Sequence, residues 1–222
     1  DMEGRDGVSP WSWDVDALVG GLGESWKILE CGMKAFPTEA LTHTHISCAL
    51  EVMVNNDLHY SDIQEVKVTA FAQAYDILFD PAKYRPESRE TADHSLPYCL
   101  AVAIVDKKIT TQSFSEEKLK DPAIYEVIDK IKGEPSLEFE KMFPAKQPSK
   151  VVVTTHDGQQ YEAYLEYPKG HPNEPMTIED IENKFNGLSA DVLTPKRQGE
   201  IKTMIFDAEK FSARDFMAKL VL

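Results

Sequence analysis

The chain has 222 residues, of which 42% are hydrophobic and 28% are charged. These proportions are ordinary for a globular protein, and the length allows a buried core in one or two domains. The formal net charge of −14 argues against nucleic acid or an anionic membrane as a partner, because phosphate groups would be repelled. The charge does not exclude a small anionic ligand, since a local basic pocket can outweigh a distant acidic surface.

The three cysteines, Cys31, Cys48 and Cys99, are widely spaced and form no CxxC pair. This spacing supports neither a structural zinc site nor a disulfide framework. Three thiols can in principle hold an iron–sulfur cluster, but their positions within apolar runs favour buried, reduced side chains. We therefore predict no metal site and a cytoplasmic location.

Before residue 55 the sequence predicts an entry loop, a short helix, a strand and a longer helix. Residues 1–25 are rich in glycine and polar residues, with Trp11 and Trp13 as candidate anchors. The apolar spacing places the short helix at 14–22, the strand at 26–33 and the longer helix at 39–54. Thr38 follows a Phe-Pro pair and can cap the longer helix.

The middle of the chain predicts one strand and several helices. Residues 63–71 show the β-branched alternation of a strand. After an irregular proline-rich loop, a helix is predicted from Glu90 or Thr91 to residue 105, with Pro97 limiting the position of its first turn. Shorter helices are predicted at 115–119 and 122–130.

The last part of the chain predicts a strand at 131–139 and a hairpin formed by residues 150–155 and 160–166. An Asp-Gly pair, typical of tight hairpin turns, lies between the hairpin strands. Helices are predicted at 177–186, 194–206 and 212–220. The pattern predicts an α+β fold, with a small mixed α/β domain at 1–170 and a helical C-terminal segment at 171–222.

Residues 89–98, Arg-Glu-Thr-Ala-Asp-His-Ser-Leu-Pro-Tyr, gather titratable groups ahead of an apolar run. If this stretch is one helix, His94 and Tyr98 share a face, where the hydroxyl can serve a leaving group or a carboxylate. The alternative is a capping network in which Thr91 and Asp93 bond helix amides. In that case His94 bonds a carbonyl group and Tyr98 is partly buried.

This stretch resembles the central signature of the MmgE/PrpD superfamily, the 2-methylcitrate dehydratase family, including its Asp-His-x-x-x-Tyr spacing. Residues 34–45, Lys-Ala-Phe-Pro-Thr-Glu-Ala-Leu-Thr-His-Thr-His, resemble the family's Lys-x-Phe-Pro segment. Residues 167–172, Tyr-Pro-Lys-Gly-His-Pro, together with 176–180, resemble its late loop and helix. The stretches occur in the family's order and cover most of the chain.

The resemblance implies that this chain is the C-terminal half of a longer enzyme. In the family, the first half is a large helical domain, and the helical C-terminal segment packs on it. We therefore expect that N-terminal helical half as a partner, a homodimer, and no cofactor. The family's other catalytic groups lie in its first half, so the chain alone is expected to show little turnover. A non-catalytic fragment or partner subunit is the alternative of another class.

The implied reaction is loss of water from a tricarboxylic hydroxy acid such as 2-methylcitrate. Decarboxylation of cis-aconitate and epimerisation of an amino- or imino-dicarboxylate are the alternatives within the family. Each begins next to a carboxylate, so the site needs acid–base groups and cations that stabilise negative charge. Lys34 and Arg89 are the candidates to bind the small tricarboxylate or dicarboxylate. A solvated lysine, and an ion pair of Arg89 with Glu87 or Glu90, are the structural alternatives.

His43 and His45 would share a face on an extended segment, as metal ligands can. On the predicted helix they diverge by about 200°, so no metal is expected there. One histidine is expected to face the cleft and the other to pack. Some relatives carry an active-site histidine where this chain has Glu39, which leaves the reaction type open. The resemblance assigns catalysis to Lys34, Glu39, His43, His94 and Tyr98, and substrate binding to Arg89, Asp93 and His45.

Overall fold

The computed structural model describes residues 14–221, so the candidate anchors Trp11 and Trp13 lie outside the described residues. The chain divides into two compact units, one ending at Cys31 and one beginning at Gly32. The predicted boundary near residue 170 stays a prediction. Within residues 14–221, no helix has both the length and the apolar character that a membrane crossing requires.

The described part of the first unit contains two short helical stretches. Helix α1 (Val15–Val19) begins after Asp14, whose side chain accepts a hydrogen bond from the Ala17 amide. This confirms the short helix, over a shorter range than predicted. The predicted strand at 26–33 is wrong, because the chain forms a 3-10 helix at Lys27–Glu30. A strand needs a partner for its backbone groups, and loose alternation over a short apolar run cannot supply one.

The second unit contains a four-stranded sheet in the order β2-β1-β3-β4. Strand β1 pairs in parallel with β2 and antiparallel with β3, which forms a hairpin with β4. The bounds are β1 Ile63–Phe71, β2 Ile131–Ser136, β3 Ser149–Thr155 and β4 Gln160–Leu165. These strands confirm the predicted α+β class and the predicted hairpin. The end of the predicted strand at 131–139 instead forms the short helix α7 (Leu137–Glu140).

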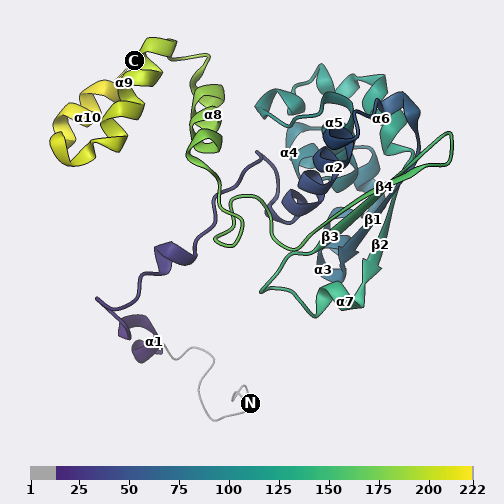
Figure 1. The fold of residues 1–222 in the computed structure, drawn as a ribbon, viewed down its shortest axis with the longest axis horizontal. Coiled ribbons are helices and arrows are strands. Elements are labelled where there is room, and N and C mark those ends of the chain that lie inside the picture. Colours follow the sequence, from purple (N-terminus) through teal and green to yellow (C-terminus); the bar gives the residue numbers. More distant parts are fainter. Residues whose placement is uncertain (1–13, 222) are drawn as a thin grey trace. The chain divides into compact units, whose positions relative to one another are not determined.

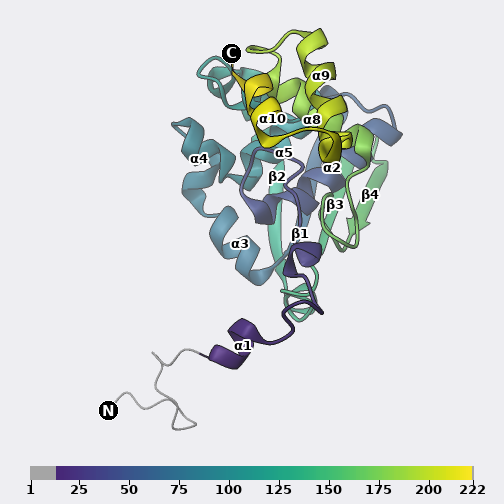
Figure 2. The ribbon, with the colours of Figure 1, turned by 90° about the vertical axis from the view of Figure 1, so that its left-hand side faces the viewer.

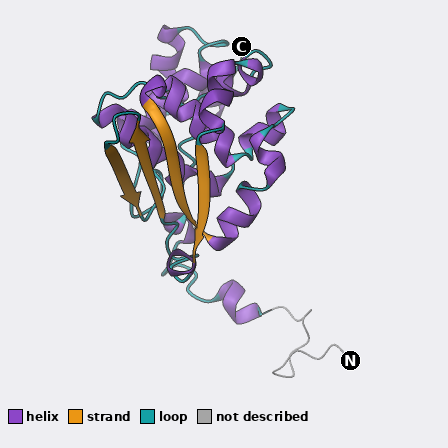
Figure 3. Ribbon diagram, turned by 90° about the vertical axis from the view of Figure 1, so that its right-hand side faces the viewer, coloured by secondary structure: helices purple, strands orange, loops and turns teal. Residues whose placement is uncertain are grey.

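One face of the sheet carries the core. Along β1 and β3 alternate residues are buried, including Val66, Val68, Val151 and Val153, as the two-residue period of a strand requires. The other face carries polar side chains such as Lys67, which pairs with Glu134 at 2.8 Å. Figure 3 shows the strands in front and the helices behind them. The helices therefore cover the face of the sheet that carries its apolar side chains.

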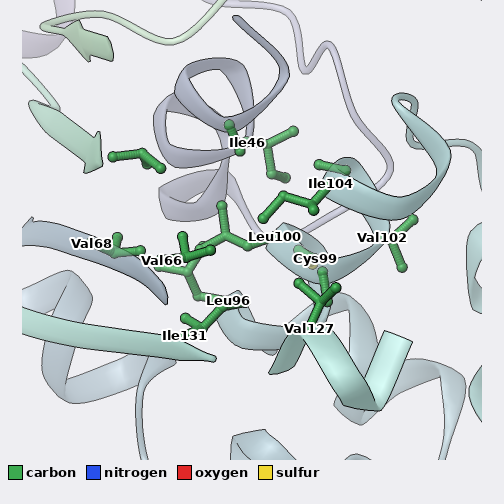
Figure 4. Packing of buried hydrophobic residues seen from close by; sticks show 14 of the residues in the cluster. Ile46, Val66, Val68, Leu96, Cys99, Leu100, Val102, Ile104, Val127 and Ile131 are labelled. Atoms are coloured by element: carbon green, nitrogen blue, oxygen red, sulfur yellow. The ribbon is translucent and has the colours of Figure 1, made fainter. Parts of the chain in front are cut away.

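Helices α2 (His43–Asn55) and α5 (Leu96–Asp106) form the layer over the apolar face of the sheet (Figure 1). Helix α2 contacts β3, β4 and α5. Figure 4 shows Ile46 of α2 and Leu100 of α5 gathered with Val66 of β1. All three side chains are fully buried. The beginning of α2 is thus fixed from two sides.

The predicted helix at 91–105 is two helices. Helix α4 (Arg89–Asp93) ends at His94, and α5 begins after Ser95, which caps it, with Pro97 in its first turn. Proline lacks an amide hydrogen and crowds the preceding turn, so it is accepted only where a helix starts. The expectation that His94 and Tyr98 share a helix face is therefore wrong.

The remaining helices extend and cover this framework. Helix α3 (Ala72–Leu78) follows β1 directly and was not predicted. Helix α6 (Pro122–Ile128) and the three C-terminal helices confirm predicted ranges within a few residues. The C-terminal helices are α8 (Ile178–Ser189), α9 (Pro195–Phe206) and α10 (Ala213–Leu220). Helices α9 and α10 lie side by side (Figure 2). Two of the three cysteines are buried as predicted, whereas Cys31 is exposed.

The start of the second unit is held against the loop that follows β4. The Met33 amide donates a hydrogen bond to the Gly170 carbonyl oxygen at 2.8 Å. Gly170 is buried and has a φ of +93°, and a Cβ at this position would overlap the Met33 carbonyl oxygen. Only glycine can adopt this positive φ and also leave room for the Met33 carbonyl oxygen without displacing the chain. The anchor sets the position of Lys34, the next residue.

We predict that Gly170→Ala destabilises the fold by roughly 2 kcal/mol more than Gly158→Ala, because it adds overpacking to backbone strain. Gly158 is the matched control, since its φ is +82° but nothing lies within 4 Å of a built Cβ. Urea unfolding of the two variants and the wild type measures the difference. Equal losses of unfolding free energy would show that the Met33 contact adds no cost.

Candidate functional site

A groove of about 710 Å³ lies between three segments of the second unit. One wall is the stretch from Lys34 to Pro37, just before α2, and another is the stretch from Ile109 to Gln112, after α5. The third wall is one face of α8, with residues at the three- and four-residue spacing that brings side chains together on a helix. These α8 residues are Asp180, Asn183, Lys184, Gly187 and Leu188.

Two lysines on this groove are held by backbone carbonyl groups. Lys34 Nζ donates to the Thr38 carbonyl oxygen at 2.8 Å, and Lys184 Nζ donates to the Lys34 carbonyl oxygen at 2.6 Å. Within residues 14–221, neither ammonium group lies within ion-pair distance of a carboxylate. A lysine ammonium has three donors, so each keeps two for another partner.

A second hollow, of about 550 Å³, differs in its charge balance. It is lined by Lys118, which pairs with Asp106 at 2.8 Å and with Asp121 at 2.9 Å. Its two lysines, Lys118 and Lys120, are balanced by Glu117 and Asp121 in the same lining. The first groove has three lysines against two aspartates and is therefore the better candidate for an anionic ligand.

His43 begins α2 directly behind the Lys34 segment, and its ring centroid lies 5.4 Å from that of Phe36. The side chain is buried, and its Nε2 atom has no hydrogen-bond partner. Burial lowers the pKa of His43 to about 4; the Thr38 carbonyl opposes this shift, and the charges of Lys34 and Lys184 add to it. His43 is therefore neutral at neutral pH and lies beside the two lysines.

His45 and Glu39 have local structural partners. The His45 ring is fully buried, with Nδ1 3.1 Å from the Leu41 carbonyl oxygen and Nε2 unpartnered. Burial lowers its pKa to about 4, against the effect of that carbonyl. The Glu39 carboxylate accepts a hydrogen bond from the Leu41 amide at 2.7 Å. Glu39 therefore caps the turn before α2, which Thr38 was predicted to do.

The structure brings the two signature segments together only in part. The Glu39 amide donates to the Asp93 carbonyl oxygen at 3.0 Å, so the end of α4 lies beside the start of the α2 region. Asp93 is partly exposed, and its Oδ1 atom lies 2.5 Å from Nδ1 of the exposed His94. Arg89 is exposed on the first turn of α4 and does not line the groove.

Tyr98 lies in the core rather than in the groove wall. Its side chain is fully buried and its hydroxyl donates to the Ser113 carbonyl oxygen at 2.9 Å. Burial also raises its pKa above the ordinary value for tyrosine. The alternative of a packed tyrosine describes this position better than a role on the groove surface.

Lys184 and Lys169 line the groove but were not among the predicted site residues. Lys169 pairs with Asp180 at 2.5 Å, so its charge is compensated. Lys184 lies 150 residues from its partner Lys34, a separation that sequence patterns do not reveal. The only sequence signal for Lys184 as a site residue was the charged and polar stripe on one face of α8. Among residues 14–221, no group of three or more His, Cys, Asp or Glu side chains is placed to hold a metal ion.

We predict that His43 and His45 make the fold sensitive to acid. Their folded pKa values, about 4, lie below the unfolded value of 6.5, so the unfolded chain binds more protons between these limits. The free energy of unfolding should therefore fall as pH drops from 6.5 to 4, by about 3 kcal/mol per histidine. Urea unfolding across this range measures the loss.

The variant His45→Gln cannot titrate and should show a shallower loss than the wild type. His156→Gln, at an exposed turn position, is the matched control and should follow the wild type. If the stability curves of the wild type and His45→Gln run parallel from pH 7 to pH 4, His45 does not contribute to the acid sensitivity.

Curated relatives of this chain carry decarboxylase names. The chain is 24% identical over 136 residues to the cis-aconitate decarboxylase of Mus musculus. The aligned stretch covers 61% of this chain and 28% of the relative. Over 115 residues it is 29% identical to the human cis-aconitate decarboxylase, covering 49% of this chain and 22% of the relative. A cis-aconitate decarboxylase-like protein of Aspergillus oryzae is 26% identical over 126 residues, or 56% of this chain and 26% of the relative. The matched stretches thus span about a quarter of each relative's length.

The match to a protein family is broader than the match to any of these relatives. The family described as the MmgE/PrpD C-terminal domain matches residues 36–209. The matched range contains the Phe-Pro segment, the signature at 89–98, the whole sheet and helices α8 and α9. Since this range covers well over half of the chain, the protein belongs to the MmgE/PrpD family through its C-terminal domain.

Proposed function

We propose that this chain is the substrate-binding C-terminal half of a cofactor-independent lyase that acts on a small polycarboxylate. The observation that carries the proposal is the groove beside α2, where the Lys34 ammonium has no carboxylate partner among the described residues. Such an ammonium can bind a substrate carboxylate as a compact point charge. The decarboxylase names of the relatives support a lyase in particular.

Cis-aconitate decarboxylation is the candidate that the relatives favour. In that reaction the bond between carbon and one carboxylate breaks, carbon dioxide leaves, and the electron pair stays on the remaining carbon skeleton. A proton then replaces the lost group. Negative charge builds up beside a remaining carboxylate, and the Lys34 ammonium would stabilise it. His43, neutral at neutral pH and with a buried Nε2 that has no hydrogen-bond partner, lies next to the Lys34 segment and is our candidate for the proton-transfer group.

Dehydration of 2-methylcitrate is the second candidate, supported by the match of Asp93, His94 and Tyr98 to that family signature. There a base removes a proton next to a carboxylate and an acid protonates the departing hydroxyl group. The same cation would serve both reactions, since both build charge on a carboxylate. Glu39, which stands where some relatives carry a histidine, already accepts an amide hydrogen bond. Acid–base chemistry on this side of the groove would then fall to His43.

The helical half of the family is the proposed partner of this chain. Helices α8 to α10 expose several large apolar side chains, including Ile178, Ile205, Phe206 and Met217. Exposed apolar side chains along successive helices are typical of a surface that another element covers. We propose that the helical half covers them, and that the complete enzyme is a homodimer as in its family. The competing proposal is that this chain is a non-catalytic partner subunit. Measuring turnover of the complete protein decides between an enzyme and such a subunit.

We predict that the 222-residue chain alone converts neither cis-aconitate nor 2-methylcitrate at a rate comparable with the protein that includes the helical half. The reason is that catalysis needs groups from both halves to converge on one substrate. Proton NMR of product formation, with each substrate in turn, measures turnover and identifies the reaction. Full activity of the isolated chain would contradict the two-half proposal.

Within the complete protein, Lys34→Ala should lower kcat/KM about 100-fold, a typical effect of losing one group that stabilises transition-state charge. The melting temperature should change little, since Lys34 is exposed. Lys196→Ala removes a charge from an exposed position on α9 and is the matched control. Unchanged kcat/KM in Lys34→Ala, or an equal loss in Lys196→Ala, would remove Lys34 from the mechanism.

A further inference from the structure

We infer that Lys184 of α8 is a second carboxylate-binding residue, so that the groove selects ligands with at least two carboxylates over monocarboxylates. This inference rests on the proposed function and adds a specificity-determining residue to it. Lys184 lies outside the three sequence stretches that resemble the family. The assignment of Lys184 to the site therefore rests on its position in the structure alone.

The first step of the argument is the geometry of the two ammonium groups. Lys184 Nζ contacts the Lys34 carbonyl oxygen, and Lys34 Nζ contacts the Thr38 carbonyl oxygen, four residues further along. Both side chains line the same groove. The two cations therefore lie at the ends of one short backbone stretch, which suits a ligand with two separated anionic groups.

The second step is the charge balance of the α8 wall. Asp180, one turn before Lys184, is occupied by Lys169 at 2.5 Å and by Thr177, whose hydroxyl lies 2.8 Å from its carboxylate. Asp191 also lines the groove, but it lies beyond the end of α8 at Ser189. Neither carboxylate forms an ion pair with Lys184. Its charge therefore stays available to a ligand.

The third step concerns the surroundings of Lys184. Its side chain is half-buried, and the charges of Lys184 and Lys34 both act on the His43 ring. The two lysines and the histidine thus form one cluster at the start of α2. A dicarboxylate bridging the two ammonium groups would lie against this cluster. A monocarboxylate carries only one negative charge and would leave one of the two ammonium charges uncompensated.

Isothermal titration of the full 222-residue chain with tricarballylate, a non-reacting tricarboxylate, tests the inference. Lys184→Gln removes the charge but keeps an N–H donor for the Lys34 carbonyl group, and Lys184→Arg keeps the charge. Lys34→Gln reports on the groove itself, and Lys196→Gln controls for net charge. Butyrate, followed by NMR titration, serves as the monocarboxylate. Circular dichroism confirms that each variant is folded.

We expect Lys184→Gln to raise the Kd for tricarballylate about tenfold, the size of one lost charged hydrogen bond. Lys184→Arg should stay within a few-fold of the wild type, Lys196→Gln should match it, and butyrate should bind far more weakly. If Lys34→Gln weakens binding but Lys184→Gln does not, the inference is overturned while the proposed function stands. If the wild type does not bind tricarballylate, both are overturned.

Discussion

The packing of α2 against the sheet is the constraint on which the candidate site depends. Helix α2 is held by β3 and β4 on one side and by α5 on the other, so its first residue cannot shift without disturbing the core. That first residue is His43, and the groove segment from Lys34 to Pro37 leads directly into it. The other end of the segment is tied by the hydrogen bond from Met33 to Gly170. An irregular segment is thereby given fixed ends, and binding groups on loops need such a scaffold to act together.

Much of the fold could be predicted because local signals agreed with tertiary demands. The alternation in Ile63–Phe71 corresponds to a strand with one buried face, and the Asp-Gly pair forms the turn of the β3–β4 hairpin. The strand predicted at 26–33 failed because its alternation had no partner strand to pair with. The single helix predicted over 91–105 failed at Pro97, because a proline belongs in the first turn of a helix and so marks the start of α5 after α4 has ended.

The candidate site was predictable where its residues are close in sequence. Lys34, Glu39 and His43 come from one stretch of ten residues, and the structure keeps them together at the start of α2. Arg89 and Tyr98 were expected beside them on the strength of motif spacing. The division of α4 from α5 turns Tyr98 into the core, while Arg89 stays on the exposed first turn of α4. Lys184 joins the site through a contact across 150 residues, which depends on how α8 packs and not on any local pattern.

Because the whole chain is acidic, the hydrogen-bond partners of the groove lysines decide whether the groove can attract an anionic ligand. With a net charge of −14, the protein repels an anionic metabolite at long range, so attraction must come from groups within the groove. A carboxylate partner would orient a lysine but also cancel its charge, as Asp180 does for Lys169. A backbone carbonyl orients the ammonium and leaves its full charge in place. Lys34 and Lys184 both have this second kind of partner, and that arrangement keeps positive charge at one place in a protein whose net charge is negative.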